Sequence, residues 1–468
     1  MDYWVALVVT VAIVVIFLRY IKFTKDVPLL YLSEQSIVED TSKSGESTIH
    51  KSNKLDFSRL RVGLDIRYDS YKLRNGNLTD IYEFFMKNPE QNIVINGETR
   101  SVYNINFLVD QIVKYIENNN IESICFKNDD FMKDFFGFSL ILAGFISQTT
   151  IIIYDYRKFE CPKNSINFNK FDFTSHFQLD GQLTTFENVY SPAKDKGIAI
   201  KLVKQIHQNL ISTVQFTQLN IISAIASNIK HLPEPNQWNS SDTLLVTQSA
   251  KLPLEEVSNS LIKILSTFIT KSNLIVTCDF RLDHLTRYNP TILFTDPQVA
   301  SVLTNPTKYL SSFQKILKKY SLLHFKLGKL PKFKPFSTNL RLIYLAKNIQ
   351  SPNFEVSDLR ACFGTRIITE SCHYRVIGPI ILTDFYDYRD FKIKFDSFGC
   401  ISQSLEIKLG DFNNNKGYLM LRGYNIGKNT FELNADVEEN KNCQNDGFLP
   451  LDDIRGSWGT DGCLYIGT

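Results

Sequence analysis

The carboxy-terminal part of the chain reads KGYLMLRGYNIGKNTF at residues 416–431, DGFLPLDDI at residues 446–454 and RGSWGTDGCLYIGT at residues 455–468. Short runs of alternating apolar residues are separated here by glycine and asparagine. This pattern is typical of antiparallel strands joined by tight turns. We therefore expect a β-rich subdomain over residues 379–468.

Upstream of this region, helix-like and strand-like patterns alternate. Apolar residues occur at helical spacing over 106–118 and 254–268. Short apolar runs typical of buried strands lie at 121–126, 149–154, 243–246, 274–277 and 291–294. Strands separated by helices favour a parallel sheet. The predicted fold class is α/β, with parallel α/β lobes over residues 60–378.

Composition limits the classes of protein to consider. The chain has 468 residues, of which 43% are hydrophobic and 22% charged, as in globular proteins of about three lobes. The 52 Lys and Arg nearly balance the 49 Asp and Glu, so we expect no nucleic-acid partner. The 8 cysteines include no Cys-x-x-Cys pair, which argues against zinc and favours buried thiols in a reducing compartment.

The amino-terminal segment YWVALVVTVAIVVIFL, residues 3–18, contains no charged residue. As a helix it would be roughly 24 Å long, which matches a thin bilayer. We predict a single-pass transmembrane anchor over residues 1–25, and a cleavable signal peptide is the alternative. Asp2 and the lack of a small-residue cleavage site argue against the alternative. The basic Arg19, Lys22 and Lys25 follow the segment, so its carboxy-terminal side is expected in the cytosol.

Residues 26–59 are rich in Ser, Thr, Glu and Lys, and we expect them to form a polar tether. Two glycosylation sequons, at Asn77 and Asn239, follow the tether. They would be modified only if the body faced the lumen, so they test the expected topology.

Several motifs together resemble those of one family. They are the carboxy-terminal run quoted above, VINGETR from residue 94, NLRLIYLAK at 339–347 and ACFGTRIITESC at 361–372. In order and spacing these resemble the adenylate-forming (AMP-binding) superfamily of acyl-CoA synthetases, over roughly residues 60–468. The leader SEQSIVEDTSKSGES, residues 33–47, is similar to that of fungal membrane-bound members.

The resemblance implies a glycine-rich loop that holds the ATP phosphates, between a strand and a helix. The matching stretch, Lys204 to Val214, contains no glycine and carries bulky residues such as Ile206 and Leu210. Backbone N–H groups approach a phosphate closely only where side chains are small. Lys204 and His207 could contact an anion, and a solvated or packing role is the alternative for both.

Two carboxylates match ligand positions of the family. Glu370 matches the magnesium ligand, with a surface or helix-capping role as its alternative, and Asp453 matches the residue that binds the ribose hydroxyls, with a structural role as its alternative. Asp452 replaces the family's glycine beside Asp453. The sequence stops at Thr468, before the family's hinge, so the small carboxy-terminal subdomain with its catalytic lysine is expected to be absent.

Without that loop and that lysine, charge that develops during adenylation has no stabilising partner. We therefore expect a non-catalytic, acyl-CoA synthetase-like membrane protein with a lipid-linked binding or scaffolding role on the cytosolic face of the endoplasmic reticulum. The mitochondrial outer membrane and lipid droplets are alternative locations. No catalytic residue, metal or cofactor is assigned, and a fatty acid, an acyl-CoA or another membrane protein could be the partner. Two other functions stay open: an active ATP- and magnesium-dependent acyl ligase with an atypical or partner-completed site, and a pure protein-interaction module.

Residues 314–335 contain seven lysines, no acidic residue and interleaved aromatic and aliphatic side chains. An anionic membrane surface would attract such a segment. The candidate membrane-surface residues are Lys315, Lys318, Lys319, Lys326 and Lys329, and an ordinary solvated helix is the alternative.

Overall fold

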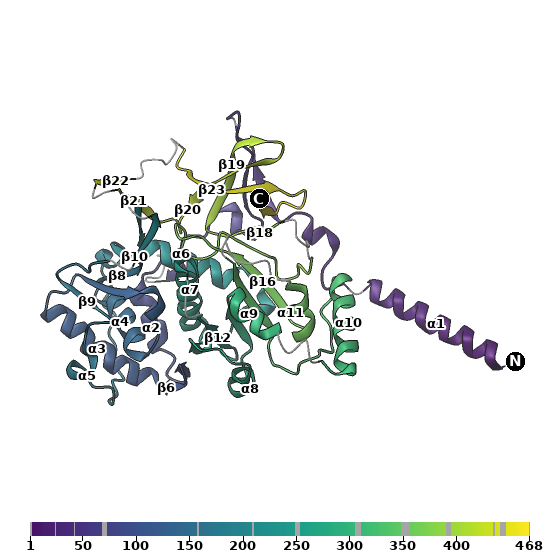
Figure 1. The fold of residues 1–468 in the computed structure, drawn as a ribbon, viewed down its shortest axis with the longest axis horizontal. Helices are drawn as coiled ribbons and strands as arrows, with labels where there is room; N and C mark the ends of the chain where they lie inside the picture. Colours follow the sequence, from purple (N-terminus) through teal and green to yellow (C-terminus); the bar gives the residue numbers. More distant parts are fainter. Residues whose placement is uncertain are drawn as a thin grey trace.

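The structure is a computed structural model, in which the described residues form two large sheets, with helices between them, and one two-stranded sheet (Figure 1). It describes residues 2–23, 25–41, 43–67, 73–156, 159–207, 210–248, 253–304, 310–347, 356–389, 395–433, 436–439 and 446–467.

The larger sheet has fifteen strands in the order β1-β2-β19-β20-β23-β24-β18-β17-β16-β15-β14-β12-β13-β5-β6. Its central strands pair in parallel: β5 (Ile93–Ile95), β12 (Thr243–Thr247), β13 (Asn273–Thr277), β14 (Ile292–Thr295), β15 (Leu342–Lys347) and β16 (Arg366–Ser371). The outer strands pair antiparallel: β1 (Ser36–Glu39), β2 (Ile49–Ser52), β6 (Glu98–Arg100), β17 (Ile381–Leu382), β18 (Ser397–Ile401), β19 (Leu405–Asn413), β20 (Lys416–Gly423), β23 (Leu449–Trp458) and β24 (Leu464–Ile466). The parallel and β-rich regions predicted from the sequence are therefore both present, and part of each lies in this sheet.

The smaller sheet has seven strands in the order β22-β21-β11-β10-β8-β7-β9. They are β7 (Ser123–Lys127), β8 (Thr150–Asp155), β9 (Ser165–Asn167), β10 (Ile198–His207), β11 (Leu210–Thr217), β21 (Lys428–Leu433) and β22 (Asp436–Glu439). Strands β7, β8, β9 and β10 pair in parallel, whereas β11 runs antiparallel to both β10 and β21. A separate pair is formed by β3 (Ile66–Arg67) and β4 (Leu73–Arg74).

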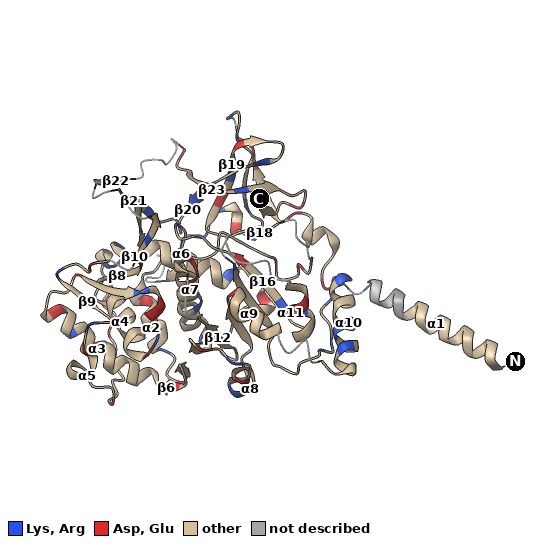
Figure 2. Cartoon of the chain, viewed as in Figure 1, with Lys and Arg blue, Asp and Glu red and all other residues tan. Residues whose placement is uncertain are grey.

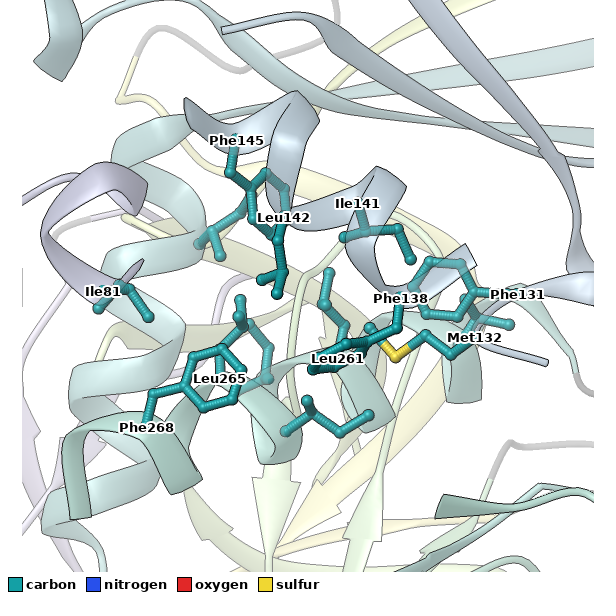
Figure 3. Close-up of a cluster of buried hydrophobic side chains, with 14 of the residues drawn as sticks. Ile81, Phe131, Met132, Phe138, Ile141, Leu142, Phe145, Leu261, Leu265 and Phe268 are labelled. Carbon is teal, nitrogen blue, oxygen red and sulfur yellow. The ribbon is translucent and has the colours of Figure 1, made fainter. Parts of the chain in front are cut away.

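Helices α2 (Leu78–Met86), α4 (Phe135–Ile146) and α7 (Leu254–Thr270) pack together between the two sheets. Their apolar side chains, among them Ile81, Leu142 and Phe268, form one buried cluster (Figure 3). Strand residues such as Ile151 of the smaller sheet and Leu274 of the larger belong to the same cluster. The remaining helices are α3 (Val102–Asn118), α5 (Phe173–His176), α6 (Gln218–Lys230), α8 (Asp283–Tyr288), α9 (Pro297–Thr304), α10 (Ser312–Lys326) and α11 (Val356–Phe363). Short 3-10 turns occupy Leu29–Leu32, Asp56–Ser58, Asn128–Asp130, Pro192–Asp195 and Glu234–Asn236.

The predicted polar tether over residues 26–59 is wrong in part, because this segment folds onto the larger sheet. Strand β2 pairs antiparallel with both β1 and β19. Its polar side chains are buried with partners: His50 bonds to Ser36 through Nδ1 at 2.8 Å and stacks on Trp458 at 3.6 Å between ring centroids. Polar residues can be buried at the edge of a sheet when their hydrogen bonds are satisfied, so composition alone does not identify a tether.

The apolar amino-terminal segment forms α1 (Asp2–Phe23), which extends away from the body (Figure 1). The described side chains of α1, at residues 3–16, are all exposed, and those of Arg19 and Lys22 lie outside the described residues. Within the described part of the chain, no helix combines the length and apolarity that a membrane crossing requires. A crossing takes about 20 apolar residues, so the predicted transmembrane anchor over residues 1–25 is not supported.

Candidate functional site

The structure brings the residues singled out in the sequence to one region, at the carboxyl ends of β10 and β16. Lys204 lies near the end of β10, and Glu370 lies near the end of β16. His373, two residues beyond β16, contacts Asp453 of β23. Carboxyl ends of strands are the usual place for ligand sites in α/β sheets. The three positions therefore form the candidate functional site.

The loop expected over Lys204 to Val214 is not present, because most of this stretch is strand. Strands β10 and β11 form an antiparallel hairpin in which His207 is opposite Leu210, so only residues 208 and 209 separate them. Strand β10 also pairs with β8, and β11 also pairs with β21. Residues 200–204 of β10 and 210–215 of β11 therefore have a neighbouring strand on each side. The described residues of this stretch, 204–207 and 210–214, therefore form no extended loop that could surround a phosphate.

The ammonium of Lys204 is neutralised by the protein itself. Its Nζ lies 2.5 Å from Oε1 of Glu255 at the start of α7, and 4.6 Å from the ring centroid of Tyr374. The side chain of His207 is exposed. Lys204 therefore follows the packing alternative: it joins the smaller sheet to α7.

Glu370 is buried, with an exposed fraction of 1%, so the surface or helix-capping alternative is wrong. Its Oε1 lies 2.5 Å from Nζ of Lys263, and its Oε2 accepts a hydrogen bond of 2.7 Å from Nδ2 of Asn259. Lys263 is also fully buried, donates to Oδ1 of Asn228 at 2.5 Å and lies 3.8 Å from the ring centroid of Tyr344. The carboxylate thus faces a cation that belongs to the chain.

The hydrogen bonds continue beneath this ion pair. Trp238 Nε1 donates to the Tyr344 hydroxyl at 3.1 Å, and that hydroxyl lies 3.0 Å from Nε2 of His231. Because Nδ1 of His231 is 2.5 Å from the carbonyl oxygen of Asn228, Nδ1 carries the proton and Nε2 accepts from Tyr344. Burial, and secondarily the Lys263 charge, lowers the pKa of His231 well below its usual range. The imidazole is therefore neutral.

Burial also changes the titration of the two groups that face Glu370. It lowers the pKa of Lys263, although the Glu370 carboxylate opposes that shift. It raises the pKa of the Tyr344 hydroxyl well above its usual range, and Glu370 adds to that shift. Lys263 and Tyr344 each have polar partners, and the cluster forms a buried network in which Oδ1 of Asn259 has no hydrogen-bond partner among the described residues.

Asp453 lies in a bulge of β23. Leu451 and Arg455 pair with adjacent residues of β20, which leaves residues 452–454 without partners on that strand. The carboxylate of Asp453 is exposed, and its Oδ2 is 3.3 Å from Nε2 of His373. The hydrogen bond from His373 lowers the pKa of Asp453. This bulge places Asp453 beside the segment that follows Glu370.

The residues present do not fit a magnesium ion and ATP. Both oxygens of Glu370 are occupied by groups of the chain, and the hairpin replaces the loop that would hold phosphate. In the described ranges, no group of three or more His, Cys, Asp or Glu side chains is arranged to hold a metal ion.

Sequence reasoning missed Lys263 and Asn259, which decide the chemistry at Glu370. They are four residues apart in α7 and so share one helix face. Polar residues at this spacing ordinarily mark a solvated face. One signal in the sequence could have indicated Lys263. Glu370 matches a site position of the family, and a carboxylate buried at such a position needs a nearby cation.

The predicted membrane-surface lysines separate into two groups on the structure. Lys315, Lys319 and Lys326 are exposed on α10, whereas Lys318 is paired with Asp358 of α11 at 3.0 Å. Lys329 is half-buried in the segment after α10. Figure 2 shows basic residues along α10.

Comparisons with solved structures identify the fold. The chain is similar to VinN in complex with L-aspartate, at 12% identity and a TM-score of 0.57, covering 87% of this chain and 100% of VinN. It is similar to the N-terminal domain of FACL13 from Mycobacterium tuberculosis, at 11% identity and a TM-score of 0.58, covering 84% of this chain and 99% of that domain. The anthranilate CoA ligase AuaEII, in complex with anthranoyl-AMP, matches at 12% identity and a TM-score of 0.58, over 84% of this chain and 76% of the ligase. The fold is that of the adenylate-forming acyl-CoA ligases.

In sequence, the chain is similar to YHR045W, an uncharacterized protein of Saccharomyces cerevisiae. The two are 24% identical, and the match covers 99% of each chain. No protein-family model matches the chain. The comparisons thus support the fold and leave the activity to be argued from the site.

Proposed function

We propose that this chain has the fold of an acyl-CoA ligase but no ligase activity. On this proposal it acts as a lipid-linked binding or scaffolding protein on the cytosolic face of the endoplasmic reticulum. The observation that carries the proposal is the ion pair between Lys263 and Glu370. A buried ammonium in contact with the carboxylate neutralises it and leaves no position for a divalent cation.

The other two candidate residues support the same conclusion. Lys204 is paired with Glu255, and Asp453 accepts a hydrogen bond from His373. Adenylation requires preorganised donors aimed at the phosphate and the reacting carboxylate. Here the charged groups at these positions are paired with other side chains of the chain. On this proposal the region stabilises the fold and offers no free charge to a reacting substrate.

The test is titration of the full chain with magnesium-ATP by calorimetry, together with fatty-acid-dependent pyrophosphate exchange. We expect neither heat of binding nor exchange, and an active acyl-CoA ligase run in parallel validates the assay. Saturable ATP binding with exchange would overturn the proposal in favour of an atypical ligase. In that case Lys204→Ala and Asp453→Asn would identify the residues that contact the nucleotide.

The lipid-linked part of the proposal is supported by α1. Its apolar side chains, residues 3–16, are exposed, including Trp4, Val8 and Ile13. Apolar surface of this extent is unfavourable in water and requires an apolar environment. We propose that a bilayer provides that environment. A fatty acid, an acyl-CoA or a second membrane protein would then be the partner of the folded body.

A further inference from the structure

Helix α10 carries two parallel stripes on its exposed side. Phe313, Ile316 and Leu323 have exposed fractions of 68%, 63% and 51%. Their spacings of three and seven residues place them on one face of the helix. The exposed lysines at 315, 319 and 326, with spacings of four and seven, form a second stripe beside the first.

The opposite side of α10 is packed against the body. Ser321, His324 and Phe325 are buried, and Lys318 is paired with Asp358. Lys315, Lys319 and Lys326 form no ion pair with any other residue in the part of the chain that the structure describes. The helix is therefore held by one side and presents a mixed apolar and basic surface on the other.

This surface adjoins the base of α1. The backbone N–H of Asp26 donates to the carbonyl oxygen of Gly328 at 3.0 Å, just beyond the end of α10. The Asp26 carboxylate accepts from the backbone N–H of Leu330 and from the Tyr388 hydroxyl, at 3.1 and 2.6 Å. These contacts fix the point at which α1 leaves the body, so α1 and α10 lie together at one end of the molecule (Figure 1).

We infer that the exposed face of α10 binds the surface of an anionic lipid bilayer. The lysines would contact lipid headgroups, while Phe313, Ile316 and Leu323 would enter the interface between headgroups and acyl chains. Charge favours this occupant over an apolar protein groove, since residues 314–335 contain no acidic residue. The inference rests on the lipid attachment proposed above and adds a second contact that orients the body.

The experiment measures flotation of the full chain with vesicles of phosphatidylcholine alone or of phosphatidylcholine with phosphatidylserine. The background variant Val8→Asp/Ile13→Asp makes α1 too polar to insert, and α1 lies outside the folded body. Binding that remains then reports on α10. We expect this variant to bind the phosphatidylserine vesicles, to bind neutral vesicles at least tenfold more weakly, and to be released by salt.

Three further changes in that background complete the test. Lys315→Glu/Lys319→Glu/Lys326→Glu should reduce binding about a hundredfold. Phe313→Ser/Ile316→Ser/Leu323→Ser should reduce binding at least tenfold. The matched control Lys163→Glu/Lys170→Glu/Lys196→Glu reverses exposed charges elsewhere and should change binding by less than about threefold.

Equal losses in the α10 and control variants would overturn the inference, as would equal binding to neutral and anionic vesicles. Circular dichroism of each variant establishes that it is folded. Flotation of the unmodified chain with neutral vesicles measures the insertion of α1 separately. Loss of α1 insertion with retained α10 binding, or the reverse, therefore distinguishes failure of the two proposals.

Discussion

Lys263 and Glu370 are the residues on which the chemistry of the candidate site depends. Removing two charges from water is costly, and their mutual attraction offsets that cost only when both partners are present and the remaining hydrogen bonds are satisfied. Here Asn228 accepts a hydrogen bond from Lys263 and Asn259 donates one to Glu370, whereas Oδ1 of Asn259 is left without a partner among the described residues. The pair therefore specifies the packing of α7 against β16 more than it adds net stability.

We predict that Lys263→Met destabilises the fold by about 3–5 kcal/mol, since it leaves a buried carboxylate without a counter-charge. Urea unfolding followed by circular dichroism measures the effect. Lys87→Met is the matched control, because it breaks an exposed pair with Glu83 and should cost at most about 1 kcal/mol.

The double variant Lys263→Met/Glu370→Leu should recover most of the lost free energy, because it removes the stranded charge as well. A Lys263→Met protein as stable as the Lys87→Met control would contradict the buried ion pair.

At the scale of elements, the strands β1 and β2 attach the amino-terminal region to the larger sheet. His50 of β2 is central to this attachment, with Ser36 at one ring nitrogen, Thr48 at the other and Trp458 stacked on its face. Burial lowers the pKa of His50 to about 4 from a usual value of 6.5. The folded state therefore favours the neutral form of the His50 imidazole.

This shift predicts a pH dependence of stability. Because the folded-state pKa lies below the unfolded value, the contribution of His50 is complete above pH 6.5 and is lost as the pH falls from 6.5 towards 4. The loss is about 3 kcal/mol at most. Urea unfolding of the wild type and of His50→Phe, at a series of pH values, measures it.

His50→Phe keeps an aromatic ring for Trp458 to stack on but cannot titrate. The difference between the two profiles isolates His50 from His231, whose pKa is also lowered by burial. Identical slopes for the two proteins between pH 6.5 and 4 would rule out the proposed role of His50.

At the scale of the whole molecule, the fold separates the two glycosylation sequons. Asn77 is buried and caps α2, where its Oδ1 accepts from the backbone N–H of Asp80 at 3.0 Å. Asn239 is exposed. Only Asn239 can report the topology of the folded body, which corrects the expectation that both sequons would.

From the proposed cytosolic position of the body, we predict that Asn239 carries no glycan when the full chain is expressed in eukaryotic cells, because a body on that side does not meet the glycosylation machinery. Mobility before and after endoglycosidase treatment measures this. Asn239→Gln is the negative control, and a sequon added before Met1 is the luminal control. A mobility shift that disappears in Asn239→Gln would reverse the proposed topology.

The proposed attachment of α1 to a bilayer gives one more prediction for the whole molecule. Full chains should remain with the membrane fraction after alkaline carbonate extraction, whereas Val8→Asp/Ile13→Asp should be released, because charged residues are costly within the hydrocarbon region. The control Glu34→Asp/Glu90→Asp changes exposed residues of the body and should stay with the membrane. Release of the unmodified chain by carbonate would contradict insertion of α1.

Sequence patterns located most elements of the fold and the positions of the candidate site, but not the side chains that pair with them. The apolar runs at 149–154 and 243–246 correspond to β8 and β12, and the helical pattern at 254–268 corresponds to α7. The stretch from Lys204 to Val214 was expected as a loop because of its place in the family pattern, although its own residues favour strands. In this stretch the strand propensity of the residues prevailed over the family pattern, since β10 pairs with β8 and β11 pairs with β21.

The sequence by itself determined the fold class, the parallel and antiparallel regions and the resemblance to adenylate-forming ligases, because hydrophobic periodicity and motif order are local properties of the chain. Only the tertiary structure decided that Lys263 faces Glu370, that Glu255 faces Lys204 and that residues 26–59 join the larger sheet. These facts depend on contacts between residues about 50 to more than 300 positions apart. The sequence does not show which residue will pair with a given charged side chain, because folding alone brings the two residues together.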